Sequence, residues 1–295
     1  LFPFLNKICL DIPNSRSSHS VCKPTGGGLS FVIVDIIFSI LLGNYSRLSL
    51  IPLASVGFLD DIFKISSIKR YFFQVFTAIL ILISSTYFPF NNSILLITPY
   101  PNLSKIFLFF FFLFFITAII NFINFMDGID GLVGSCFLVI FFFRSLDGNI
   151  FLIPLIGSLV VFLFFNWQPS KIFMGDVGST YLAAIYCNLI FTLPNMIDSF
   201  SFILLGVPIL GDAFFTILKR ILLGKNIFKA HRDHLYQRLV LAGWGHSKVS
   251  IMYTFCTILL AISYKLFGFY LLLNLSIVLL FFGIFLDIKF AKKII

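Results

Sequence analysis

Twelve acidic residues occur in the chain, and every one of them is an aspartate. Asp60 and Asp61 are adjacent at the end of one apolar run, Asp127 and Asp130 follow a second run, and Asp176 follows a third. Carboxylates that gather at the ends of apolar segments repel one another unless a cation joins them. A divalent metal that arrives with an anionic substrate would neutralise them, so these acids are the first candidates for catalysis.

The pair Asp60-Asp61 ends the segment GFLDDIFK. Adjacent side chains on a helix point about 100° apart, so the two acids cannot chelate one ion as a simple pair. One of them could face a metal or a phosphate while the other accepts hydrogen bonds. Lys64 could steady the pair or meet a phosphate. The alternative interpretation is a solvated helix end.

Polar side chains recur every third residue in NFINFMDGIDGL, which includes Asn124, Asp127 and Asp130. At this spacing they line one broad face, and the glycines allow the backbone to turn or to approach a ligand closely. A helix that simply ends in a polar turn is the alternative. It accounts for the glycines but not for so many polar side chains.

The segment NWQPSKIFMGDVGS begins at Asn166 and leads into another apolar run. Asp176 could cap the helix that follows. A carboxylate between glycines, beside free backbone N–H groups, is equally a place for magnesium and a diphosphate. Phe173 could offer a stacking face for a base.

His231, Arg232 and His234 lie in HRDHLYQRL, within the longest polar segment. Arginine grips phosphate oxygens in a bidentate manner, so this cluster suits anion binding. HxxH could also bind zinc, but no third ligand is evident. A basic segment that only sets membrane orientation is the remaining alternative. An earlier segment, DIPNSRSSH followed by PTGGG, is also polar, and its three glycines indicate either a phosphate nest or close helix packing.

The composition determines which elements must position these residues. Hydrophobic residues make up 59% of the 295 residues and charged residues 11%, with a mean hydropathy of +1.05. A soluble globule needs roughly 25% charged residues, so a soluble enzyme and intrinsic disorder are excluded, and the scattered cysteines exclude a disulfide scaffold. The continuous apolar runs predict an all-α polytopic transmembrane helix bundle. About ten spans are expected near 26–43, 47–59, 71–89, 106–123, 131–144, 149–166, 177–193, 201–218, 251–267 and 269–287.

The basic residues predict the orientation of this bundle. Lys and Arg number 16 in one set of alternating segments and four in the opposite set, which places the first set in the cytoplasm. Because they lie between apolar runs, they do not indicate nucleic-acid binding. Residues 1–295 form one predicted integral-membrane domain, and 1–10 read as the end of a first helix whose beginning is missing. The predicted cytoplasmic loops are 11–25, 60–70, 121–131, 166–176 and 219–249.

Five motifs in this order resemble those of the polyprenyl-phosphate sugar-1-phosphate transferases: DIPNSRSSH with PTGGG, GFLDD, NFINFMDGIDGL, FNWQPSKIFMGDVGS and the histidine segment. The resemblance covers nearly the whole chain. HRDHLYQRL is more similar to the O-antigen initiating branch than to the peptidoglycan branch, in which three consecutive histidines are expected.

The resemblance implies transfer of a HexNAc-1-phosphate from a UDP-sugar to undecaprenyl phosphate, with release of UMP. It implies Mg²⁺ as the cofactor, with Mn²⁺ as a substitute, and a bacterial inner-membrane enzyme whose active site faces the cytoplasm. A homodimer is a further expectation. The implied catalytic residues are Asp60, Asp61 and Asp176, with Asp176 and Asp60 on the metal. The implied substrate-binding residues are Asn124, Asp127, Asp130, Asn166, Phe173, His231, Arg232, His234 and Lys64.

Two rival functions remain open. A transporter or channel could use Asp35 and Asp212 as intramembrane ion or proton sites, although the acids cluster at one face and paired broken helices are not apparent. Asp35 could instead be a packed, hydrogen-bonded residue, and Asp212 could support the site from behind. An inactive truncated relative is the third interpretation.

Overall fold

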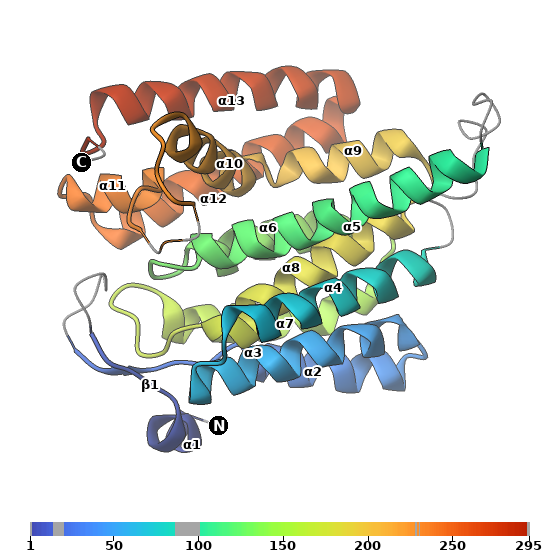
Figure 1. Ribbon diagram of the computed structural model, residues 1–295, viewed down its shortest axis with the longest axis horizontal. Helices are drawn as coiled ribbons and strands as arrows, with labels where there is room; N and C mark the ends of the chain where they lie inside the picture. Colours follow the sequence, from blue (N-terminus) through green and yellow to red (C-terminus); the bar gives the residue numbers. More distant parts are fainter. Residues whose placement is uncertain (1, 14–20, 86–100, 228, 230, 294–295) are drawn as a thin grey trace.

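The computed structural model is an almost entirely helical bundle (Figure 1) and describes residues 2–13, 21–85, 101–227, 229 and 231–293. Asn14, Arg16 and His19 of the first polar motif lie outside the described residues. The helices are α1 (Phe2–Ile8), α2 (Leu29–Leu41), α3 (Ile51–Phe63), α4 (Ser67–Ser84), α5 (Pro101–Met126), α6 (Leu132–Ser145), α7 (Ile153–Asn166), α8 (Gly175–Thr192), α9 (Met196–Leu205), α10 (Val207–Leu222), α11 (Leu235–Leu241), α12 (His246–Phe267) and α13 (Phe269–Lys289).

Short elements complete the described part of the chain. Strands β1 (Leu10–Asp11) and β2 (Lys23–Pro24) pair antiparallel. The 3₁₀ helices η1 (Tyr45–Leu50) and η3 (Ile150–Leu152) precede α3 and α7. The prediction of an all-α membrane bundle is therefore confirmed.

Within the described residues each predicted span overlaps helical structure, but the lengths differ, and residues 86–89 of the predicted span 71–89 lie outside the described residues. Four helices in the described part are long and apolar enough to cross a membrane, namely α4, α5, α12 and α13. The predicted span 201–218 is instead a broken helix, in which α9 and α10 meet at 75° and together would make a fifth span. At the break, the Tyr186 hydroxyl donates to the carbonyl oxygens of Phe202 and Ile203, at 2.8 and 3.0 Å. Such a side-chain donor is what allows a helix to break at membrane depth.

Helix α8 forms the centre of the bundle, and its residues from Val177 to Phe191 are all buried. Its neighbours approach closely because glycines lie at the contacts. A methyl group on Gly28 would lie 2.3 Å from the Cα of Gly178, and one on Gly57 would lie 2.8 Å from the carbonyl oxygen of Asp176. Gly28 of the glycine run therefore serves close packing of α2 against α8, one of the two roles predicted for that run, and Gly57 serves the packing of α3 against α8.

Asp35, in the middle of α2, is held by two partners in the interior. The Tyr181 hydroxyl of α8 donates to its Oδ2 at 2.7 Å, and the Nε of Arg47 lies 3.7 Å from the same oxygen. Asp35 and Arg47 are each only 1% exposed. These contacts favour the packed, hydrogen-bonded interpretation of Asp35 over an ion-conducting one.

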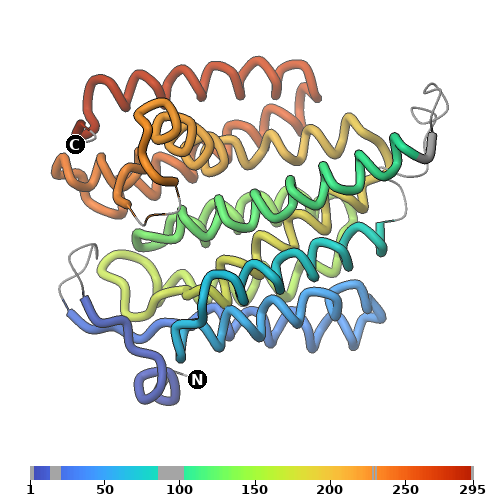
Figure 2. Tube along the Cα trace, viewed as in Figure 1, coloured from blue at the N-terminus to red at the C-terminus, as the bar shows by residue number. Residues whose placement is uncertain are grey.

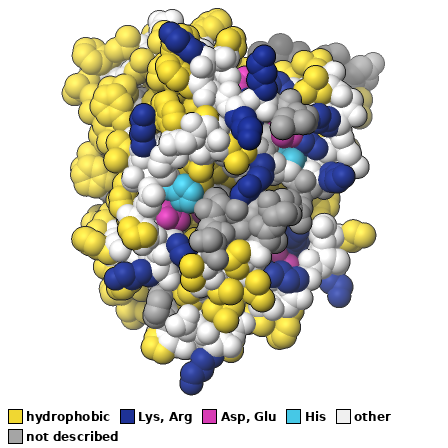
Figure 3. Space-filling model, turned by 90° about the vertical axis from the view of Figure 1, so that its left-hand side faces the viewer, with side chains coloured by type: hydrophobic (Ala, Val, Ile, Leu, Met, Phe, Trp, Pro, Cys, Tyr) yellow, Lys and Arg dark blue, Asp and Glu magenta, His cyan; other side chains and the backbone are white. Residues whose placement is uncertain are grey.

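One end of the bundle gathers the polar chemistry. α1 at the bottom, and α11 and the end of α13 at the top, all lie toward the left of Figure 2. Seen face-on in Figure 3, this end carries many Lys and Arg side chains together with His and Asp. We call it the polar end, defined by Asp60, Asp61, Asp127, Asp176 and the segment 231–234.

Candidate active site

The acids of α3 and α8 meet at the polar end. Asp60 and Asp61 occupy the last turn of α3, and Asp176 lies in the first turn of α8. Because Gly57 lets α3 rest directly on the backbone of α8, residues 115 or more positions apart in sequence come into contact. The structure therefore brings together the three residues predicted to be catalytic.

Asp61 is the cap of α8. Its two carboxylate oxygens accept the backbone N–H groups of Asp176 at 2.9 Å and of Val177 at 3.2 Å. These are orphan donors at the start of the helix, and a carboxylate there is favoured by the helix dipole. Gly175 has a left-handed backbone (φ 76°), and a methyl group on it would lie 2.4 Å from Asp61 Oδ2. The hydrogen-bonding role expected of one acid in the pair therefore falls to Asp61.

Asp60 and Asp176 are joined by an arginine. The Nη1 of Arg70, from the first turns of α4, lies 3.0 Å from Asp60 Oδ2 and 2.8 Å from Asp176 Oδ2. The other oxygen of Asp60 is buried without a hydrogen-bond partner. A guanidinium thus holds the position between two carboxylates at which a divalent cation was predicted.

Asp127 lies beside this group on the connection between α5 and α6, where it is partly buried. Burial, together with the negative charges of Asp176 and Asp130, raises the pKa of Asp127 to about 7. A carboxyl with this pKa changes its charge near neutrality, which is typical of functional sites.

Asp130 is engaged elsewhere. It accepts the backbone N–H of Ser170 at 3.2 Å and the Ser170 hydroxyl at 2.8 Å. The Nδ1 of His246 lies 3.4 Å from its Oδ2. Although burial alone would raise its pKa, these contacts with His246 and Ser170 hold the pKa of Asp130 below its ordinary value. In this structure Asp130 joins three segments rather than presenting a free carboxylate.

Asn166 also holds loops together. Its Oδ1 accepts the backbone N–H of Gly131 at 3.0 Å, and its Nδ2 donates to the carbonyl oxygen of Ile172 at 2.9 Å. Both polar atoms of the buried side chain are therefore used. The predicted nucleotide-binding role of Asn166 would have to be indirect, through the two loops that it connects.

Asn124 and Phe173 remain partly accessible. The ammonium of Lys23 lies 5.2 Å from the ring centroid of Phe173 and 3.0 Å from the Ser170 hydroxyl, to which it donates. A partly exposed ring beside a cation is a fitting surface for an aromatic base and its phosphate.

The histidine segment is anchored by Asp212. This buried carboxylate accepts the backbone N–H groups of Leu235 and Tyr236, at 2.8 and 3.0 Å, and thereby caps α11. It also accepts the Tyr253 hydroxyl at 2.7 Å. With so many donors, Asp212 positions the loop before α11, which supports its predicted role behind the site.

His231 and His234 lie with ring centroids 5.1 Å apart, and Arg232 between them is partly buried. Burial, together with the neighbouring His234 and Arg220, lowers the pKa of His231 to about 4. His231 is therefore neutral at pH 7 and acts as a hydrogen-bonding group. The Tyr236 hydroxyl donates to the carbonyl of Phe125 at 2.9 Å, which links the segment to the end of α5.

Lys64 acts on Asp61 through its charge. It ends α3 in a left-handed conformation (φ 52°), its side chain is exposed, and none of the contacts described for α3 joins its ammonium directly to Asp60 or Asp61. Whether it meets a phosphate stays a prediction.

Arg70, Ser170, Lys23 and His246 contact the predicted residues but were not predicted as site residues. Each belongs to a polar segment that was recognised, so position at the membrane face was the available signal. Their partners lie on other helices, which sequence spacing does not show.

Comparisons with known proteins agree with this geometry. The family model described as glycosyl transferase family 4 matches residues 45–194. The chain is 29% identical over 265 residues to a probable undecaprenyl-phosphate N-acetylglucosaminyl 1-phosphate transferase of Bacillus subtilis, covering 80% of this chain and 71% of the relative. It is 26% identical over 273 residues to a phospho-N-acetylmuramoyl-pentapeptide-transferase of Carboxydothermus hydrogenoformans, covering 81% and 82%. The corresponding enzyme of Clostridium perfringens strain SM101 is 30% identical over 264 residues, covering 80% and 79%.

Proposed function

The chain belongs to glycosyl transferase family 4, and on this premise we propose that it transfers a HexNAc-1-phosphate from a UDP-sugar to undecaprenyl phosphate. Its relatives are named as transferases of a sugar phosphate or its pentapeptide derivative. The observation that carries the proposal is the meeting of Asp60 and Asp176, bridged by Arg70, at one end of a membrane bundle.

The location suits both substrates. A nucleotide sugar is soluble in water, whereas the acceptor carries its phosphate on a hydrocarbon chain, so their phosphates can meet only at a membrane boundary. The polar end lies at such a boundary, and its excess of Lys and Arg favours the cytoplasmic side of the bacterial inner membrane. An entering nucleotide would reach Asp127 and Phe173 on their loops and Asn124 in the last turn of α5.

Magnesium, with manganese as a substitute, is the cofactor that we assign to this reaction. Among the described residues, no three His, Cys, Asp or Glu side chains form a ready metal cage. Mg²⁺ is usually held by one or two carboxylates together with substrate phosphates. Asp176 and Asp60 would supply those carboxylates, and the unpartnered oxygen of Asp60 fits this role. The bound ion would supply positive charge to the diphosphate.

The reaction is best written as one displacement. An oxygen of the lipid phosphate attacks the phosphorus attached to the sugar, and the bond from that phosphorus to the oxygen of UMP breaks. The bond between sugar and oxygen is untouched, so the anomeric configuration is retained. One phosphoanhydride bond replaces another, so the equilibrium constant of the reaction should be close to one. Added UMP should therefore drive the reaction backward.

The protein groups have separate tasks in this step. The second pKa of a phosphate monoester is about 6, so most of the lipid phosphate already carries two charges at pH 7. Asp60 would orient this nucleophile or remove a residual proton, since Asp61 is occupied by the N-terminus of α8. Arg70 would offset the charge of the approaching phosphates. A covalent aspartyl phosphate is the less favoured route, because the dianionic acceptor needs no activation.

The product would initiate a cell-envelope glycan. The segment HRDHLYQRL favours an O-antigen or related glycan, while two of the relatives named above carry a peptidoglycan precursor in their names. N-acetylglucosamine, N-acetylfucosamine and N-acetylquinovosamine are the sugars to compare. A homodimer is the assembly that we expect.

The test uses membranes that contain the full chain, undecaprenyl phosphate, Mg²⁺ and each UDP-sugar in turn. We expect release of UMP and a lipid diphosphosugar of matching mass. Asp176→Asn should abolish UMP release, whereas Asp147→Asn, in a pair with Arg144 away from the polar end, should leave it unchanged at equal expression. Near-normal magnesium-dependent turnover by Asp176→Asn would remove Asp176 from the role of metal ligand, and transport without UMP release would disprove the proposed transfer.

A further inference from the structure

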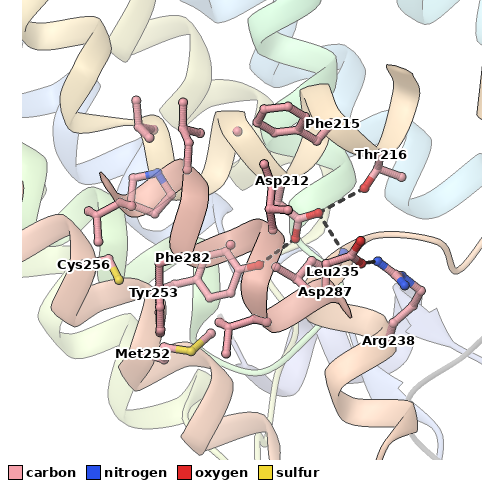
Figure 4. A pocket seen from close by; sticks show the side chains of 18 of the residues that line it. Asp212, Phe215, Thr216, Leu235, Arg238, Met252, Tyr253, Cys256, Phe282 and Asp287 are labelled. Atoms are coloured by element: carbon pink, nitrogen blue, oxygen red, sulfur yellow. Dashed lines mark hydrogen bonds and ion pairs between the residues drawn. The ribbon is translucent and has the colours of Figure 1, made fainter. Parts of the chain in front are cut away.

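A cleft lies between α10, α12 and α13, apart from the carboxylates of the candidate active site (Figure 4). Its walls are mostly apolar and include Phe215, Met252, Cys256 and Phe282. Gly283 of α13 also lines it, and a methyl group added there would find no atom within 4 Å. The cleft is therefore wide enough at Gly283 to admit a hydrocarbon chain.

The inner polar group of the cleft is already satisfied. Asp212 accepts hydrogen bonds from Tyr253, Leu235 and Tyr236, and from the Thr216 hydroxyl at 3.1 Å. A carboxylate with four donors has its hydrogen-bonding capacity filled, so it needs no polar group from an occupant. The depth of the cleft thus suits an apolar chain.

The outer end of the cleft is basic. Lys219 and Arg238 both pair with Asp287, so two cations meet one carboxylate at this end, while the charge of Asp212 lies deeper in the cleft. Arg238 Nη1 donates at 3.0 Å to the carbonyl oxygen of Lys292, so the segment that follows α13 lies next to this end of the cleft. The side chain of Lys219 is 42% exposed, and an ammonium has three donors, so it can hold Asp287 and a phosphate together.

We propose that this cleft binds one anionic diacyl phospholipid of the surrounding bilayer. Its phosphate would lie beside Lys219, and an acyl chain would run past Gly283 toward Phe215. Basic pockets between transmembrane helices bind anionic headgroups in this way. The cleft includes none of Asp60, Asp61 and Asp176, and the proposal does not depend on which sugar is transferred.

The bound lipid would stabilise the histidine segment. Leu235 and Arg238 of α11 line the cleft, and Arg238 Nε donates to the carbonyl of Asp233 at 3.0 Å. An occupant that packs against these residues lowers the free energy of the ordered loop. Anionic lipid should therefore protect the folded chain as well as bind to it.

The experiment is a titration of the delipidated full chain by native mass spectrometry, with phosphatidylglycerol and phosphatidylcholine of equal chain length. We expect one molecule of phosphatidylglycerol to bind tightly to each chain. The Tm of the chain should be higher with phosphatidylglycerol than with phosphatidylcholine. Lys219→Gln should weaken phosphatidylglycerol binding about fivefold, and Gly283→Phe should abolish the tight site by filling it.

Matched controls lie elsewhere on the bundle. Lys265→Gln changes a lysine that pairs with Asp147, and Gly157→Phe adds a ring where a methyl group also meets no atom within 4 Å. Both should bind phosphatidylglycerol like the wild type. Equal binding of the two phospholipids, an unchanged site in Gly283→Phe, or retention of polyprenyl phosphate in place of phospholipid would overturn the proposal.

Discussion

Arg70 bridges the two carboxylates that we assign to the metal, so the arginine and a divalent cation should compete for them. Its Nη1 lies 3.0 Å from Asp60 and 2.8 Å from Asp176. Replacing it with methionine keeps an unbranched side chain but removes the charge and the donors. Arg70→Met should therefore bind Mn²⁺ more tightly in the absence of substrates.

The size of the effect follows from these contacts. A hydrogen bond to a charged group contributes about 1.5–3 kcal/mol. The Arg70 side chain is 36% exposed, so water screens the bridge and about 1–2 kcal/mol is the better estimate. This corresponds to a gain of roughly 5- to 30-fold in Mn²⁺ affinity.

The assay is the fraction of free Mn²⁺ measured by electron paramagnetic resonance with the detergent-solubilised chain. Lys64→Met is the matched control, because it removes a nearby positive charge whose side chain is exposed; we expect less than a threefold gain. The double variant Arg70→Met with Asp176→Asn should lose the gain. Unchanged or weaker Mn²⁺ binding by Arg70→Met alone would refute competition at this position.

Three further predictions concern the groups that hold the site. Asp61→Ala should lower stability by about 1–2 kcal/mol because α8 loses its cap, and an unchanged thermal unfolding curve would contradict that role. Asp212→Ala should cost about 3 kcal/mol or more, since it leaves several buried donors unpaired; limited proteolysis should then cut before α11, whereas Asp198→Ala should resist like the wild type. Because the folded pKa of His231 is lowered to about 4, its stabilising contribution is complete above pH 6.5 and is lost as pH falls toward 4. His231→Asn should therefore remove about 3 kcal/mol of acid destabilisation, and identical pH–stability profiles for the variant and the wild type would exclude this.

The residue types that make the site could be predicted from their position. Asp60, Asp61 and Asp176 end or begin apolar runs, and the distribution of basic residues places those ends at one membrane face. The long apolar runs also predict the helices, because a segment that spans a membrane must form all its backbone hydrogen bonds within itself. These signals depend only on neighbouring residues, so they can be recognised in a single amino-acid sequence.

Long-range partners were not predictable in the same way. That Asp61 caps α8 depends on α3 resting on α8 at Gly57, and that Asp130 turns to Ser170 depends on how two loops fold over each other. The break at Gly206 likewise depends on the Tyr186 hydroxyl of another helix. Helix spacing shows which residues share a face, but the register between helices is decided by packing.

Helix α8, which carries Asp176, is enclosed along its length by other helices. The four long apolar helices are instead only 17–39% buried over their apolar windows. A thicker or thinner bilayer is accommodated mainly by tilting of lipid-facing helices. The carboxylate on α8 is thereby insulated from such adjustments, so the enzyme can keep its reactive geometry in membranes of differing thickness.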